Sequence, residues 1–312
     1  MKKGIFHTIV QVARLYYEQD LSQQQIADKL GVSRSLIAKY LIQAREEGVV
    51  EIRVIDPSES NERLSKIIKD RHGLQYVTVL PSSHKALTLT LQAVGYAAAR
   101  FLAEHVEDGH KVGIAWGRST QSFVDQLSTQ NIDKTDVSVV PLMGESSNAR
   151  IHTRMNHLVE QFAESIRATP YFLFYPMIVD SKALFSRIME EEALRRIVKL
   201  WEGLDWVFMG IGVLPPTPGM NVYIPEALLP ELEQKKVIGD ICCRYFDAQG
   251  RIVKASFADR IVAVGADHLR RTKRVVGIAA GAGKEKALRG ALKTGLLTDI
   301  FIDQELASRI VD

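Results

Sequence analysis

The chain has 312 residues, of which 46% are hydrophobic and 25% are charged, with a formal net charge of +3. This length gives room for a large core and more than one domain, and the composition excludes a disordered or fibrous protein. The weakly positive charge permits an anionic partner but does not require one.

The first residues and the cysteines indicate the compartment. Two lysines precede an apolar stretch, as in a signal peptide, but polar residues interrupt it, no cleavage site follows, and no later run is long and apolar enough to span a bilayer. Cys242 and Cys243 are adjacent, and neighbours in a strand point to opposite faces, so the pair predicts neither a disulfide framework nor a zinc knuckle. We expect a cytoplasmic protein without a membrane partner.

Apolar residues at helical spacing predict a first helix over residues 9–16, followed by a polar break. Ser22 and Gln25 then match a capping box, which begins a second helix. Gly31 can take the left-handed conformation that ends this helix, and Ser33 can cap a third one. Short helices joined by so short a turn predict a helix-turn-helix. Its inner face is expected to hold Ile26, Ala27, Leu30, Ile37 and Tyr40.

The residues left facing outward on this unit are short, polar or basic. Small side chains let the third helix approach the major groove closely, Arg34 can bond a guanine edge or a phosphate, and Lys39 suits a phosphate. The alternating segment 48–56 predicts a strand beside the helices, a candidate wing against the DNA backbone. The alternative is a helical hairpin that serves dimerisation or core packing. The expected contacts to double-stranded operator DNA are Ser22, Gln23, Ser33, Arg34, Ser35, Ala38 and Lys39.

The residues after position 56 predict a second, larger domain. A polar break and a charged amphipathic helix predict a linker helix over 57–73, between a helix-turn-helix domain, 1–56, and an effector and oligomerisation domain, 74–312. In the latter, apolar runs of strand length alternate with helical patterns, which implies an α/β fold with a mostly parallel sheet. The predicted strands are 76–80, 111–116, 137–143, 205–212, 274–280 and 299–302, and the clearest helices are 87–107 and 156–168.

Glycines and polar residues follow four of these strands. Ligands of parallel sheets bind beyond the carboxyl ends of the strands, where glycines let backbone amides approach an anion and cationic or hydroxyl side chains donate to it. A glycine after one strand is more often a plain turn, but four such ends favour a pocket. The candidate pocket residues are Gly117, Arg118, Ser119, Thr120, Gly144, Glu145, Ser146, Gly210, Gly212, Asp240, Gly281, Gly283 and Lys284.

Motif tests narrow the chemistry of this pocket. The phosphate-loop pattern fails because Ile278 replaces its first glycine and Glu285 replaces its Ser or Thr. The dinucleotide fingerprint lacks its third glycine, no G-x-S-x-G elbow occurs, and no two histidines have H-x-x-x-H spacing, so neither a cofactor nor a metal is expected. The pocket suits a small phosphorylated polyhydroxy molecule, with Lys284 and the Gly281 and Gly283 amides at the phosphate. The alternative for Lys284 is a solvated surface lysine.

The chain resembles the SorC family of bacterial sugar-responsive transcriptional regulators, also grouped with sugar-binding regulators of the DeoR type. The resemblance spans nearly the whole chain and depends on "LYYEQDLSQQQIADKLGVSRS", "VGIAWGRST", "VVPLMGES", "LDWVFMGIG", "GDICCRYFDAQG" and "GIAAGAGKEKALRGALKTGLLTDIFIDQELA". It implies a helix-turn-helix, an effector domain with a fold like phosphosugar isomerases and CoA transferases, and a homo-oligomer, a dimer or tetramer. A sugar phosphate or related effector is then expected to change operator binding.

Two positions depart from the family pattern. Glu145 stands where members commonly have a second glycine, which would narrow the pocket or add a hydroxyl acceptor. Met143 stands where some relatives have a lysine that can form a Schiff base, and a thioether cannot do so.

The main alternative function is a phosphosugar isomerase or deaminase with an appended DNA-binding domain. Asp240 and Glu145 would then serve as its acid and base. We favour a regulator without enzymatic activity, because the front of the chain carries a DNA-binding unit. A purely structural oligomerisation protein would explain neither the basic helix nor the glycine-rich loops.

Overall fold

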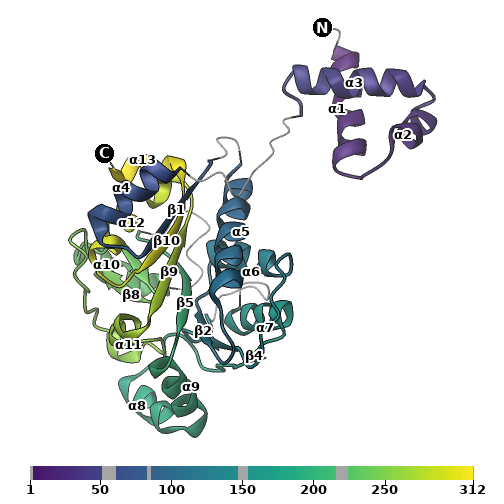
Figure 1. Cartoon of the computed structure of the whole chain (residues 1–312). Coiled ribbons are helices and arrows are strands. Elements are labelled where there is room, and N and C mark those ends of the chain that lie inside the picture. Colours follow the sequence, from purple (N-terminus) through teal and green to yellow (C-terminus); the bar gives the residue numbers. More distant parts are fainter. Residues whose placement is uncertain (1–2, 51–60, 83–85, 147–153, 216–223, 312) are drawn as a thin grey trace. The chain divides into compact units, whose positions relative to one another are not determined.

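The computed structural model describes residues 3–50, 61–82, 86–146, 154–215 and 224–311 (Figure 1). The chain divides into two compact units, residues 1–55 and 56–312. Among the described residues, no helix is long and apolar enough to cross a membrane.

The small unit consists of α1 (Lys3–Tyr17), α2 (Gln23–Leu30) and α3 (Arg34–Glu46). The predicted capping box is confirmed: the Gln25 amide donates to Ser22 Oγ at 3.3 Å, and the Ser22 amide donates to Gln25 Oε1 at 2.9 Å. Gly31 ends α2 with a left-handed φ of 66°, and Ser33 Oγ accepts from the Leu36 amide at 3.2 Å. The helix-turn-helix is therefore set by local hydrogen bonds. Its apolar core is formed by Val12, Leu15, Ile26, Ala27, Ile37 and Leu41.

The predicted strand over 48–56 is not found in its described part. Residues 48–50 form a turn and a bend after α3, and Val49 and Val50 pack against the buried Ile9, Ala13 and Ala44. The remainder, 51–56, lies outside the described residues.

A seven-stranded sheet forms the centre of the larger unit, in the order β1-β10-β9-β5-β2-β3-β4. All its neighbouring strands pair in parallel, which confirms the predicted α/β fold with a mostly parallel sheet. The two-residue edge strand β4 was not predicted, because two residues leave no pattern to read. The strands are β1 (Tyr76–Leu80), β2 (Lys111–Ile114), β3 (Ser138–Pro141), β4 (Thr169–Pro170), β5 (Trp206–Gly210), β9 (Arg274–Ala279) and β10 (Asp299–Asp303).

Helices cover both faces of this sheet. Figure 1 shows α5 (Leu87–His105), α6 (Arg118–Leu127) and α7 (Met155–Ile166) on one side, and α4 (Glu62–His72), α12 (Glu285–Lys293) and α13 (Gln304–Val311) on the other. Helix cover on both faces explains why the strands read as continuous apolar runs. The remaining helices are α8 (Lys182–Glu190), α9 (Glu192–Glu202), α10 (Leu229–Gln234) and α11 (Ala266–Arg271), with single 3₁₀ turns at Glu226–Leu228, Ala258–Arg260 and Ala282–Lys284 (η4).

A small antiparallel sheet lies beyond the end of β5, and it corrects the expectation for the cysteines. It contains β6 (Gly212–Val213), β7 (Gly239–Ile241) and β8 (Arg244–Phe246). Ile241 pairs with Arg244, so Cys242 and Cys243 form the two-residue turn between β7 and β8, with φ values of 48° and 60°. The pair therefore does not lie in a strand with its side chains on opposite faces, and both thiols are free and buried.

The predicted linker helix is part of the larger unit. Helix α4 contacts β1 and α13. The Asn61 amide donates to the Val79 carbonyl at 2.8 Å, and Arg71 Nη1 donates to the Val311 carbonyl at 2.7 Å. These bonds hold α4 against the first strand and the last helix of the chain, and residues 57–60 lie outside the described part.

Candidate functional site

The candidate DNA-binding residues gather at the start of α3 and α2. Arg34, Ser35 and Lys39 are exposed and Ala38 is partly exposed, whereas Ile37 on the opposite face is fully buried. The hydroxyls of Ser33 and Ser35 lie 3.0 Å apart, while Ser22 caps α2 and Gln23 begins it. The first turns of α3 thus present two cations and short polar side chains to solvent, a surface that fits a DNA groove.

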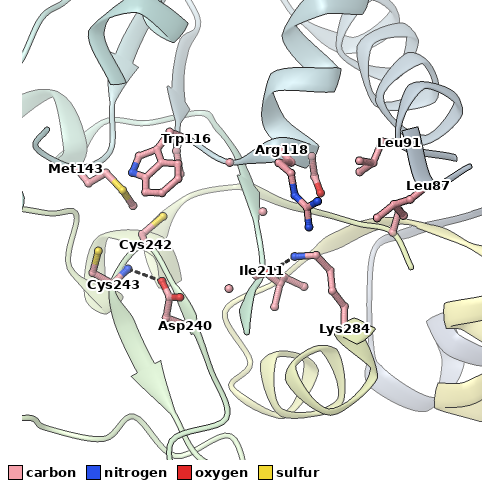
Figure 2. A pocket seen from close by; sticks show the side chains of 16 residues that line it. Leu87, Leu91, Trp116, Arg118, Met143, Ile211, Asp240, Cys242, Cys243 and Lys284 are labelled. Carbon is pink, nitrogen blue, oxygen red and sulfur yellow. Dashed lines mark hydrogen bonds between the residues drawn. The ribbon is translucent and has the colours of Figure 1, made fainter. Parts of the chain in front are cut away.

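The carboxyl ends of β2, β5 and β9 and the β7–β8 turn enclose a small cavity in the larger unit. Its volume is about 70 Å³. Figure 2 shows the Arg118 guanidinium and the Lys284 ammonium pointing toward each other, with leucines of α5 on one side and sulfur-bearing residues on the other. Seven of the predicted pocket residues line this cavity: Gly117, Arg118, Ser119, Gly210, Gly212, Asp240 and Lys284.

Lys284 is a pocket residue rather than a solvated surface lysine. Its ammonium donates to the Ile211 carbonyl at the end of β5. The pKa of Lys284 is lowered from 10.5 to about 8, chiefly by burial and also by the nearby Arg118 charge, while the Asp240 charge acts in the opposite direction. Two cations that face each other in a partly buried site repel, so an anion placed between them is stabilised by both.

Arg118 comes from the first turn of α6, directly after Gly117. Gly117 has a φ of 153°, a conformation that side chains rarely adopt, and it turns the chain from β2 into the helix. The helix amino terminus adds unpaired backbone amides and a positive dipole end to the Arg118 charge. This end of the cavity is therefore suited to a negatively charged group.

Asp240 supplies the opposite chemistry at the wall of the cavity. It is buried, and one carboxylate oxygen accepts from the Cys243 amide at 3.0 Å. A carboxylate beside two cations lets one small ligand present both an anion and hydroxyl donors.

The sulfur-bearing wall was not predicted. Cys242, Cys243 and Met143 line the cavity, and Cys243 Sγ lies 3.1 Å from Met177 Sδ. Burial raises the pKa of both thiols, and the Asp240 charge raises it further, so they stay neutral and form an apolar wall. The available sequence signal was two short strand patterns separated by two residues, but Cys-Cys is not a usual turn pair.

Gly144, Glu145 and Ser146 do not line the cavity, although the sequence placed them there. The Glu145 carboxylate accepts from the amides of Met155 at 3.0 Å and Asn156 at 2.9 Å, so it caps the start of α7. Gly144 lies against the backbone of the segment around Tyr175, where an added Cβ would meet the Tyr175 carbonyl oxygen at 2.5 Å. Glu145 and Ser146 border a separate surface hollow. The predicted role of Glu145 as a hydroxyl acceptor in this pocket is therefore wrong.

Three other predicted residues, Thr120, Gly281 and Gly283, are not among those that line the cavity. The Gly281 amide donates to Asp303 Oδ1 at 2.7 Å, so it is not free to hold a phosphate. Thr120 is buried and donates to the Gly117 carbonyl at 2.9 Å. Gly283 borders a different hollow, which it shares with Val213.

A wider vestibule adjoins the cavity, with a volume of about 520 Å³. The two share five lining residues, Arg118 among them. Gln92, Gln121 and Asp125 add amide and carboxylate groups to the vestibule. A ligand whose anion lies between Arg118 and Lys284 can therefore extend polar groups outward.

Within the ranges that the structure describes, no three His, Cys, Asp or Glu side chains form a group that could hold a metal ion. The residues lining the cavity include one carboxylate, two neutral thiols and no histidine.

Comparisons with known proteins agree with this architecture. Residues 56–312 match the family model described as "Putative sugar-binding domain". The chain is 30% identical to the deoxyribonucleoside regulator of Bacillus subtilis (strain 168), over 97% of this chain and 96% of that protein. It is 28% identical to the sorbitol operon regulator of Klebsiella pneumoniae, over 97% of each.

The crystal structure of the full-length sorbitol operon regulator SorC from Klebsiella pneumoniae is similar across both units. The TM-score is 0.78 at 28% identity, and the match covers 98% of this chain and 99% of that one. The fold and the matches define a transcriptional regulator with a sugar-binding domain. The chain belongs to the SorC family of such regulators, which confirms the resemblance seen in the sequence.

Proposed function

We propose that residues 1–56 bind operator DNA and that residues 74–312 bind a small phosphorylated sugar or polyol, which changes the affinity for DNA. The regulated genes belong to carbohydrate or polyol metabolism, in keeping with the operons named for the relatives. The observation that carries the proposal is the cavity in which Arg118 and Lys284 face each other beside Asp240.

The charges of the cavity favour a ligand with an anion at one end. A phosphate between Arg118 and Lys284 relieves their repulsion and accepts charge-assisted hydrogen bonds from both. Asp240 then accepts from a hydroxyl of the ligand, and the neutral sulfur wall packs against its carbon chain. A free anion would contact only Arg118 and Lys284, whereas an uncharged sugar would contact only Asp240 and the sulfur-bearing wall.

The protein acts without turnover in this proposal. Aldose–ketose isomerisation requires a base near the acidic carbon and an acid for the second proton. The cavity offers Asp240, whereas the second candidate, Glu145, caps α7 outside it. Incubation with sugar phosphates followed by product analysis distinguishes a regulator from an isomerase or deaminase. Catalytic formation of a product would contradict the proposal that the protein acts without turnover.

Assembly follows from the demands of DNA recognition. One helix-turn-helix reads only a few base pairs, so specific binding requires paired half-sites and at least a dimer. A DNA-binding regulator acts where the chromosome lies, which in a bacterium is the cytoplasm. We therefore propose a cytoplasmic homo-oligomer, a dimer or tetramer.

The effector site is tested by calorimetric titration with inorganic phosphate and a panel of sugar phosphates and their unphosphorylated sugars. We expect phosphorylated compounds to bind, and Lys284→Ala or Arg118→Ala to raise the dissociation constant about tenfold to a hundredfold, the usual effect of losing a charged hydrogen bond. Lys286→Ala is the matched control, because Lys286 lies two residues further along the chain, in the first turn of α12, is exposed and does not line the cavity. Equal affinity in all four proteins would overturn the site.

The DNA-binding unit is tested with a duplex selected from a random library by the full-length chain. Arg34→Ala should cost about 1–3 kcal/mol on the selected duplex and reduce discrimination against random DNA. Lys39→Ala should weaken both complexes alike and flatten their salt dependence. Arg45→Ala is the control, because Arg45 is exposed at the far end of α3. Unchanged binding by the first two variants would contradict the recognition helix.

A further inference from the structure

Asp303 holds together two loops at the carboxyl edge of the sheet. It is the last residue of β10 and is 1% exposed. Its Oδ1 accepts from the Gly281 amide at 2.7 Å, and its Oδ2 accepts from the Ser82 hydroxyl at 2.7 Å. Ser82 Oγ in turn accepts from the Glu305 amide in the first turn of α13, also at 2.7 Å. One buried carboxylate thus joins the loop after β9, the segment after β1 and the start of α13.

The first of these bonds leads to the effector cavity. Gly281 has a left-handed φ of 92° and opens the turn that carries Lys284, and the Lys284 amide closes this turn on the Gly281 carbonyl at 3.1 Å. The position of the Lys284 ammonium therefore depends on where Gly281 is held. A ligand that draws this ammonium away from the Ile211 carbonyl pulls on the same turn.

The second bond leads to helix α4. Ser82 lies two residues beyond β1, and within β1 the Val79 carbonyl accepts from the Asn61 amide at 2.8 Å. The Val79 amide donates to Ser65 Oγ at 3.2 Å, so both backbone groups of Val79 bond to the start of α4. Asn61 also caps α4 by accepting from the Leu64 amide at 3.0 Å.

Helix α4 is reached from Asp303 by a second route as well. The carboxyl end of α13 accepts from Arg71 of α4 through the Val311 carbonyl. Helix α4 follows residues 51–60, the segment through which the chain continues from the helix-turn-helix unit. Helix α4 is therefore the first described element of the larger unit after the DNA-binding unit along the chain.

We propose that Asp303 is a positioning residue that couples occupancy of the effector cavity to helix α4, a proposal that depends on the function assigned to this cavity. Each carboxylate oxygen serves a different loop, and a buried donor that loses its acceptor costs about 1–3 kcal/mol. The loops bearing Lys284 and Ser82 therefore shift together rather than separately. If the ligand binds one position of these two loops more tightly than the other, it shifts the equilibrium between them and with it the position of α4.

Two substitutions cut this connection without removing a cavity residue. Asp303→Ala removes both carboxylate oxygens, so neither the Gly281 amide nor the Ser82 hydroxyl keeps its acceptor. Ser82→Ala leaves the Gly281 bond intact and removes the hydroxyl between Asp303 and the start of α13. Asp205→Asn is the matched control. Asp205 accepts from the Lys111 amide at 3.0 Å and directly precedes β5, so it lies at the amino-terminal ends of the strands, away from Asp303 at their carboxyl ends.

The experiment is hydrogen–deuterium exchange of the full-length chain with and without saturating inorganic phosphate, followed by mass spectrometry. In the wild type, phosphate should slow exchange in the peptide over 281–288 and also in the peptide over 61–72, by about fivefold, the low end of usual coupling factors. In Asp303→Ala and Ser82→Ala the first peptide should still respond and the second should not. Asp205→Asn should behave as the wild type.

The possible outcomes are distinct. A response of both peptides in both variants, or of the first peptide alone in the wild type, overturns the role of Asp303 and leaves the effector site standing. No response of the first peptide in the wild type contradicts the phosphate site itself and removes the basis of the coupling. If Asp303→Ala does not fold, Ser82→Ala decides the matter alone.

Discussion

β2 and β3 are neighbouring parallel strands, and the loop after each contains a glycine followed by polar residues. After β2, Gly117 turns the chain into α6 and places Arg118 at the effector cavity. After β3, Gly144 lets the chain pass close to Tyr175, and Glu145 bonds the two first amides of α7. The first loop lines the cavity that we propose for the effector, whereas the second loop caps helix α7.

This difference shows that a polar side chain after a strand can be assigned to a ligand only if it is not already hydrogen-bonded to nearby backbone groups. The amino terminus of α7 has no side-chain cap from Arg154, and Glu145 supplies its acceptors from a distant position in the sequence. β2 lies next to the central strand β5, while β3 lies next to the edge strand β4. The loops after β2 and β3 thus differ in their neighbouring strands, and local sequence patterns do not indicate the order of the strands in the sheet.

The largest expected effect comes from Gly144→Ala. Its Cβ would lie 2.5 Å from the Tyr175 carbonyl oxygen, so the two backbone segments must separate, and we expect a loss of about 3 kcal/mol in the free energy of unfolding. Gly210→Ala is the control, because an added Cβ there meets nothing within 4 Å. Urea titration measures both, and equal stability of the two variants would remove the proposed close approach.

A smaller effect is expected from Glu145→Ala, which leaves two amides of α7 without their acceptor. The free energy of unfolding should fall by about 1 kcal/mol, as for loss of other helix caps, while the dissociation constant for inorganic phosphate stays unchanged. Glu160→Ala on the same helix, where the side chain is exposed, should change neither. Weaker phosphate binding in Glu145→Ala would return this residue to the effector site and end the contrast between the two loops.

The last expected effect is confined to alkaline pH and concerns the protonation of Lys284. With a pKa of about 8, its ammonium loses its proton as the pH rises above this value, and an anion then binds only with uptake of a proton. Phosphate affinity should fall by less than about twofold between pH 7.5 and 8 and then by up to about tenfold per pH unit. Lys284→Arg should abolish this fall, because a guanidinium stays protonated. A wild-type affinity that is constant up to pH 9.5 would contradict the lowered pKa.

The same shift has a consequence for stability. The pKa of Lys284 is lower in the folded chain than the 10.5 of an exposed lysine, so between about pH 8 and 10.5 the unfolded chain binds more protons. The free energy of unfolding of the ligand-free protein should therefore rise with pH through this window relative to Lys284→Arg.

The sequence was most informative where structure is set by near neighbours. Ser22, Gln25, Gly31 and Ser33 interact with residues at most five positions away, and each does what its local pattern predicts. The parallel sheet was also predictable, because strands buried on both faces are apolar throughout. Lys284 could be placed in the pocket because it follows β9, a strand next to β5, and its ammonium donates to the Ile211 carbonyl after β5; its contact with an effector stays a prediction.

No local sequence pattern indicates which distant segments of the chain pair with each other. The bond between Gly281 and Asp303 joins positions 22 residues apart, and the bond between Ser82 and Asp303 joins positions 221 apart. The small sheet of β6, β7 and β8 escaped prediction because its strands have two or three residues. These short pairings also decide which side chains line the cavity, including the cysteines.

Cys242 and Cys243 are the chain's two cysteines, and both are enclosed beside Asp240. A thiol reagent reaches neutral, enclosed sulfur only when the β7–β8 turn opens, so the labelling rate counts openings of this one wall. The rate of thiol labelling therefore reports local opening of the β7–β8 turn without any introduced probe, and a bound effector that stabilises the closed turn should lower this rate.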